Sequence, residues 1–168
     1  KAGITTDILG KEIEDTIKKY GFKPIENLSG HLIMPYVVHA GKSIPNYHTR
    51  GGDLLEEDDL IAIEPFATNG TGHVVEMARS EIFMIAGEVP TRNTRARQLF
   101  QRVFEERKTM PFSERWYVKN ADDKIAFREL IKNGSFYSYP VLKEKGNGIV
   151  AQFEHTMLVE KTGVKILF

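Results

Sequence analysis

The fold of this chain is best predicted from residues 60–66, Leu60-Ile61-Ala62-Ile63-Glu64-Pro65-Phe66. Apolar side chains recur at every second position here, which is the spacing of a β-strand. The strand points Ile61 and Ile63 to one face, and the other face carries Leu60, Ala62, Glu64 and Phe66. A carboxylate among packed apolar neighbours costs several kcal/mol unless it is paired, protonated or bound to a cation. Glu64 is therefore a candidate functional residue.

A second long strand is expected over residues 148–160. On one face it carries Ile149, Ala151, Phe153, His155 and Met157, and on the other Val150, Gln152, Glu154, Thr156 and Leu158. Glu154 is again a carboxylate inside a strand. His155 points to the opposite face, so the two side chains cannot bind one ion from a regular strand. We expect His155 to lie in the core or behind the site.

One helix is predicted before these two strands in the sequence, and two more are predicted between them. Residues 6–20 form an amphipathic helix with Thr5 and Thr6 as N-caps, Gly21 as C-cap and one apolar stripe, which needs a sheet or helix to cover it; the stripe is Ile8, Leu9, Ile13, Ile17 and Tyr20. Two more helices, one from Asn93 and one from Asn120 to Gly134, place a helical subdomain at residues 90–140, with Phe112 and Trp116 as packing anchors. The fold class is α/β, with residues 1–89 and 141–168 forming the main domain.

Composition excludes several classes of function. The 168 residues carry 23 basic and 23 acidic side chains, so no overall charge favours nucleic acid. The chain has no cysteine, which excludes disulfides, cysteine nucleophiles and sulfur-rich zinc sites. No apolar run approaches the roughly 20 residues that cross a bilayer, and no signal peptide is visible. We expect a cytoplasmic protein whose metal ligands, where it has them, are His, Asp and Glu.

His31 joins the two glutamates as a candidate ligand because it directly follows a turn-like segment, residues 27–30. Imidazole and carboxylate groups suit Zn, Mn, Co or Fe. The alternative for each glutamate is a simple ion pair with Lys or Arg. His39 sits where a strand runs into a small-residue turn, and its alternative is a loop histidine bonded to the backbone. His48 and His73 are expected on surface loops.

Four blocks of sequence resemble the signature blocks of type 2 methionine aminopeptidases, in the archaeal form. They are Asn27-Leu28-Ser29-Gly30-His31, Val38-His39-Ala40-Gly41-Lys42, Ala62-Ile63-Glu64-Pro65-Phe66 and Ala151-Gln152-Phe153-Glu154-His155-Thr156. The resemblance implies a pita-bread α/β fold in which residues 90–140 are the helical insert of the type 2 enzymes. It also implies a hydrolase that removes the initiator methionine from nascent polypeptides, and we expect a monomer without a membrane or specific nucleic-acid partner.

The resemblance also implies roles for individual residues. His31, Glu64 and Glu154 correspond to three ligands of a pair of divalent ions (Co, Mn, Fe or Zn), and Glu154 to the one that bridges them. His39 corresponds to a histidine that contacts the substrate near the scissile bond. Glu64 is the candidate for moving the proton. Phe66 and Tyr139 correspond to positions near the methionine pocket.

The chain departs from the family at its front. Family members carry an upstream hairpin with two aspartate ligands and a further catalytic histidine; none of the chain's own aspartates at helix or loop positions matches them, namely Asp7, Asp15, Asp53, Asp58 and Asp59. We therefore expect an N-terminally incomplete enzyme segment that is inactive alone. One alternative is a non-catalytic pita-bread module that binds protein or RNA. A proline-specific peptidase is disfavoured by the insert and by the Asn-Leu-Ser-Gly-His block.

Overall fold

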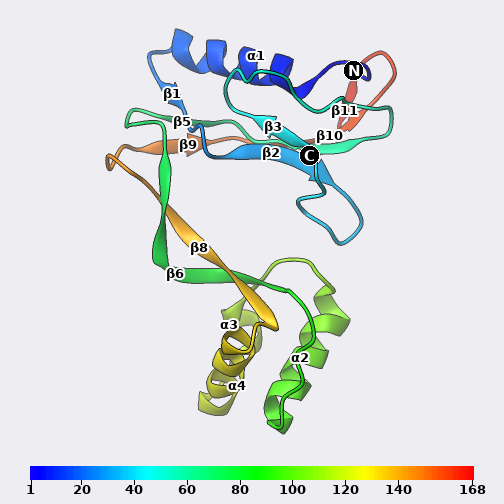
Figure 1. Cartoon of the computed structure of the whole chain (residues 1–168), viewed down its shortest axis with the longest axis vertical. Helices are drawn as coiled ribbons and strands as arrows, with labels where there is room; N and C mark the ends of the chain where they lie inside the picture. The colour runs from blue at the N-terminus through cyan, green and yellow to red at the C-terminus, as the bar shows by residue number, and fades with distance from the viewer. The chain divides into compact units, whose positions relative to one another are not determined.

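All 168 residues are described by the structure, a computed structural model, and they form two compact units (Figure 1). The first unit comprises Lys1–Val75 and Leu142–Phe168, and the second comprises Glu76–Val141. The first unit contains α1 (Thr6–Lys19), β1 (Lys23–Pro24), β2 (Ser29–Ile33), β3 (Ser43–Pro45), β4 (Leu60–Ile63), β5 (Phe66–Thr68), β9 (Val150–Gln152), β10 (His155–Val159) and β11 (Val164–Ile166). Two long strands, β6 (Val74–Ile85) and β8 (Phe136–Glu144), continue from the first unit into the second.

The larger sheet of the first unit has the order β11-β10-β4-β2-β3, and all its neighbours are antiparallel. One face is covered by α1, as expected for the apolar stripe of this helix (Figure 1). Leu9 and Ile13 of α1 pack there against a core that contains Ile44, Leu55, Ile61 and Val159. The opposite face, which carries Ala62, is left for the candidate site.

The predicted caps of α1 are only partly right. Thr5 is the N-cap residue by position, but its side chain makes no capping hydrogen bond. Thr6 is buried, and its Oγ1 accepts from the backbone N–H of Asp53 at 3.1 Å, which ties the start of the helix to a neighbouring loop. On the apolar stripe, Ile8 and Tyr20 are exposed, so fewer residues cover the sheet than the periodicity predicts.

The prediction of two long continuous strands was wrong, because part of each belongs to a second, smaller sheet with the order β1-β5-β9. Residues 60–66 do not form one strand: β4 ends at Ile63 and β5 begins at Phe66, in a different sheet. The expected strand over 148–160 is likewise divided into β9 and β10. Pro65 has no N–H to donate to a ladder, so the first strand changes sheets there. Glu64 and Glu154 therefore lie at strand breaks and not inside strands.

The second unit combines a three-stranded sheet, in the order β7-β6-β8, with the helices α2 (Thr94–Arg107), α3 (Glu114–Tyr117) and α4 (Ala121–Lys132). Strand β7 is Phe112–Ser113. The predicted helix starts are confirmed, because the side chains of Asn93 and Asn120 accept backbone N–H bonds at the N-termini of α2 and α4. Phe112 is a core anchor as expected. Trp116 is not: it is 40% exposed under the Arg107 guanidinium, and Tyr117 fills the core in its place. The expected subdomain at residues 90–140 lies within this unit.

One buried carboxylate holds the loops that lead into β9. Glu144 is only 4% exposed and accepts hydrogen bonds from the backbone N–H and Oγ1 of Thr71 and from the N–H of Gly148. These bonds, the one from the Thr71 side chain foremost, lower the pKa of Glu144 to about 2. The ionised carboxylate thus accepts hydrogen bonds from loop N–H groups in place of backbone carbonyls.

Glu144 makes the stability of the protein depend on pH in the acid range. A carboxylate whose pKa is lower in the folded than in the unfolded chain stabilises the fold above its unfolded pKa, near 4.5, and this contribution is lost as the pH falls toward 2. We expect Glu144→Gln to lower the urea midpoint of unfolding at pH 7. The variant should also show a smaller further fall of this midpoint between pH 5 and pH 2.5. Urea unfolding at both pH values measures this, with the exposed Glu57→Gln as the control. Equal midpoints for Glu144→Gln and the wild type at pH 7 would contradict it.

Candidate metal centre

Three candidate ligands that are far apart in the sequence share one face of the larger sheet. Ala62 in β4 is the register partner of His31 in β2 and of Thr156 in β10. Glu64 lies two residues beyond Ala62, and Glu154 two residues before Thr156, so both follow the same face as His31. The ladder that pairs Ile63 with His155 and the ladder that pairs Phe66 with Gln152 have the same register. Glu64 is therefore opposite Glu154, where the two strand breaks meet.

Direct contacts connect these residues. The Nε2 atom of His31 lies 3.3 Å from Oε1 of Glu64. The Nε2 atom of Gln152 donates to Oε2 of Glu64 at 3.4 Å and to Oε2 of Glu154 at 3.2 Å. Since β4 and β10 are adjacent strands, the pairing of the sheet brings the candidate ligand side chains together.

Neither glutamate has a basic partner of the ordinary kind. No ion pair joins Glu64 or Glu154 to a lysine or arginine; the ion-pair partner of Glu64 is His31. Like charges directly opposite each other in an antiparallel pair are destabilising. The alternative that each glutamate forms an ion pair with its own Lys or Arg is therefore wrong. The two carboxylates together concentrate negative charge, which favours a cation.

Burial differs among the three residues. The side chains of His31 and Glu64 are 11% and 17% exposed, in agreement with the argument that such groups need partners. Glu154 and Gln152 are exposed, so the sequence argument from a packed strand was wrong for Glu154. Its significance comes from its position opposite Glu64 and not from burial.

The two histidines of the site have opposite pKa shifts. The hydrogen bond that His31 donates to Glu64 raises the pKa of His31, and partial desolvation opposes this. His39 packs edge-on against His31, with ring centroids 4.5 Å apart. Partial burial, and then the neighbouring His31, lower the pKa of His39. The surroundings thus favour the neutral ring for His39 and the charged ring for His31.

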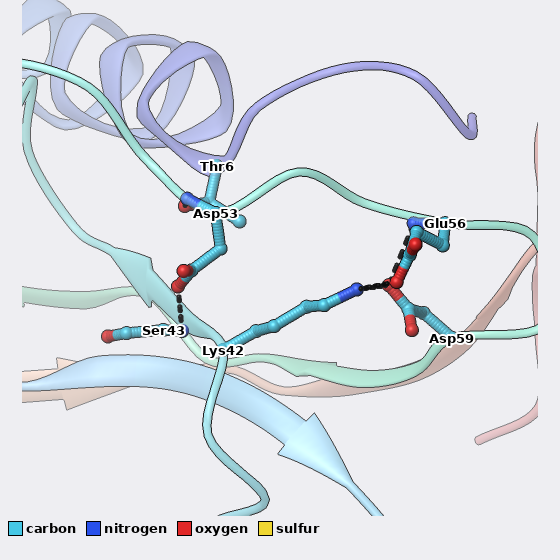
Figure 2. Close-up of polar contacts among 6 residues, drawn as sticks. All are labelled: Thr6, Lys42, Ser43, Asp53, Glu56 and Asp59. Atoms are coloured by element: carbon cyan, nitrogen blue, oxygen red, sulfur yellow. Dashed lines mark hydrogen bonds and ion pairs between the residues drawn. The ribbon is translucent and has the colours of Figure 1, made fainter.

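A polar network fixes the end of the loop that carries His39 (Figure 2). Lys42 Nζ donates to Asp59 Oδ2 at 2.7 Å and to Glu56 Oε2 at 2.8 Å. Asp53 Oδ2 accepts from the N–H of Ser43 at 2.8 Å. On the other side, the N–H of Ala40 donates to the carbonyl of Leu32 in β2. Two of the aspartates noted in the sequence, Asp53 and Asp59, thus serve this loop.

The donors fit a divalent metal in chemistry but do not form a complete cage. One imidazole and two carboxylates are ligands that Zn, Mn, Co and Fe accept. The structure nevertheless contains no group of three or more His, Asp or Glu side chains arranged to hold a metal ion. The Gln152 amide stands against both carboxylates. A metal site at His31, Glu64 and Glu154 therefore stays a prediction.

The remaining candidate residues have contacts of their own. Phe66, in β5, is the register partner of Gln152. Tyr139 belongs to the second unit, where its hydroxyl donates to Sδ of Met84 at 2.8 Å, so its place in a methionine pocket stays a prediction. His73 faces Glu26 at 3.6 Å on the surface. His155 is directed to the C-terminus, with Nδ1 2.8 Å from the Phe168 carbonyl, and is not a core residue.

Sequence reasoning gave Gln152 no role. The available signal was its position two residues before Glu154, on the same face of a strand.

Solved structures with this fold support the architecture. The structure of a thermophilic Arx1 matches 96% of this chain and 45% of its own with a TM-score of 0.80 at 22% identity. Methionine aminopeptidase from Thermotoga maritima matches 99% of this chain and 43% of its own with a TM-score of 0.57 at 20% identity. These likenesses show the fold, which is of the pita-bread type. None of the helices is long and apolar enough to cross a membrane.

Sequence comparison gives the family. Methionine aminopeptidase of Thermococcus onnurineus is 46% identical over 99% of this chain and 58% of its own length, and that of Pyrococcus abyssi is 48% identical over 98% and 57%. The chain thus spans a little over half the length of the curated relatives it matches. The family model of metallopeptidase family M24 matches residues 1–161. The chain therefore belongs to metallopeptidase family M24.

Proposed function

We propose that this chain is the larger part of a methionine aminopeptidase, a metal-dependent hydrolase that removes the N-terminal methionine from polypeptides. The observation that carries the proposal is that Glu64 and Glu154 face each other without a Lys or Arg partner. His31 lies next to them, with its Nε2 atom 3.3 Å from Oε1 of Glu64. The likeness to archaeal methionine aminopeptidases supports the choice of substrate.

His31, Glu64 and Glu154 would hold divalent metal, two ions in the complete enzyme, together with ligands from outside the 168 residues. Bound ions of this kind make hydroxide available near neutral pH and polarise the peptide carbonyl. We accordingly expect the 168-residue chain alone to be inactive.

The residues of the chain itself would position and move protons. Glu64, at the end of β4, would take the proton from the attacking water and pass it to the leaving amine. His39, with its lowered pKa, would donate an N–H to the oxygen that becomes negative. Phe66 and Tyr139 are proposed for the methionine pocket. We further propose that the enzyme is a cytoplasmic monomer with no specific nucleic-acid partner.

A second candidate function is a pita-bread module that binds protein or RNA without catalysis. It is favoured by the lack of any group of three His, Asp or Glu side chains arranged around an ion position. This function does not explain why the Glu64 and Glu154 carboxylates face each other, since facing like charges only destabilise a binding module.

The two functions are separated by an assay of the full-length gene product on the peptide Met-Ala-Ser with added Co²⁺ or Mn²⁺. We expect methionine release that is abolished by a chelator and restored by the metal. N-acetyl-Met-Ala-Ser, which lacks the free amine, is the control substrate and should remain intact. A folded protein that binds neither ion and releases no methionine would reject the enzyme in favour of the binding module.

A further inference from the structure

We propose that Gln152 is a positioning residue that fixes the relative orientation of the Glu64 and Glu154 carboxylates; this inference rests on the proposed function. Gln152 is the last residue of β9, and Glu154 follows it on the same face. Its register partner is Phe66, two residues beyond Glu64. Gln152 is thus the same-face neighbour of both glutamates at the strand breaks.

One amide nitrogen donates to both carboxylates. A glutamine amide has two N–H donors on one nitrogen, and here that nitrogen lies 3.4 Å from Oε2 of Glu64 and 3.2 Å from Oε2 of Glu154. Oε1 of Glu64 faces His31 instead. Each oxygen of Glu64 therefore has its own neighbour, which restricts rotation of the carboxylate.

An amide is suited to this position because it is neutral. A lysine or arginine would orient the same carboxylates, but its charge would neutralise them and compete with a cation. A hydrophobic residue would leave them free to rotate apart under their mutual repulsion. Partners that orient metal ligands through hydrogen bonds raise metal affinity by about 10- to 100-fold. Gln152 supplies orientation while leaving the negative charge available.

The test compares the full-length gene product with its Gln152→Met and Gln152→Lys variants. For Gln152→Met, which keeps the length of the side chain, we expect the Kd for Co²⁺ to rise about 10-fold or more. The visible absorption bands of bound Co²⁺ should shift, and kcat should fall with little change in KM. Gln152→Lys should bind Co²⁺ more weakly still. Calorimetry and absorption spectroscopy measure binding independently of activity.

The matched control is Gln101→Met on α2, where the Gln101 amide donates to Oε1 of Glu105 at 2.9 Å on an exposed helix face. It removes the same kind of contact from the second unit and should leave Co²⁺ binding unchanged. If Gln152→Met binds Co²⁺ with the affinity and spectrum of a functional wild type, the positioning role is overturned and the proposed function stands. A folded wild type that takes up no cation overturns both proposals.

Discussion

Replacing Glu154 by glutamine is expected to reduce kcat/KM for methionine release from Met-Ala-Ser by about a thousandfold or more. The substitution keeps the size of the side chain but removes the charge that faces Glu64 across the strand break. Metal ions supply several kcal/mol of transition-state stabilisation, and each 1.36 kcal/mol lost costs about tenfold in rate. The measurement is kcat/KM of the full-length gene product at saturating Co²⁺, with the metal content determined in parallel.

Glu160→Gln is the matched control for this substitution. Glu160 is exposed and directly follows β10, the strand that begins one residue after Glu154. The control should leave kcat/KM and metal content unchanged. Retained activity of Glu154→Gln with a full complement of two ions would show that Glu154 is not a shared ligand.

Gly30→Ala is expected to destabilise the protein by about 3 kcal/mol, at the upper end of the range for overpacking. A Cβ atom at Gly30 would lie 2.3 Å from the carbonyl oxygen of Ala62, which is backbone and cannot rotate away. The strands β2 and β4 would have to separate, and His31, the next residue, would move with β2. Urea unfolding of the full-length protein should show a lower midpoint with an unchanged m-value.

Gly163→Ala provides the control for Gly30→Ala, because a Cβ atom at Gly163 would meet no heavy atom within 4 Å. Its unfolding midpoint should stay within about 0.5 kcal/mol of the wild type, as for most surface substitutions. Equal stability of the Gly30→Ala and Gly163→Ala proteins would mean that β2 and β4 tolerate a wider spacing than the structure shows.

The helices were predictable because their signals are local. Asn93 and Asn120 begin α2 and α4 as expected, and the amphipathic stripe of α1 identified a helix that covers a sheet. The strands were predicted with the right side-chain faces but without their breaks. Alternation continues through both breaks, because one register connects the two sheets. A pattern of period two therefore cannot reveal where the chain changes sheets.

The candidate site residues could be selected from the sequence, but their spatial arrangement could not. His31, Glu64 and Glu154 were selected by unusual positions and by the resemblance, and the structure brings them to one sheet face. Their convergence depends on pairing between β2, β4 and β10, which are distant in the sequence. Gln152 was not selected because an uncharged, exposed side chain carries no signal until its partners are known. Trp116 was misplaced because size alone does not decide between core and surface.

The facing strand breaks restrict how this part of the gene is able to change in length. One codon inserted after Ile63 would shift the following residues by one position and turn Glu64 to the opposite side of the sheet. One codon inserted between Gln152 and Glu154 would likewise place these two residues on opposite faces. Two simultaneous insertions, one in each strand, would preserve the pairing of β5 with β9 but would still turn Glu64 away from His31. The length of the chain at these two places should therefore stay constant.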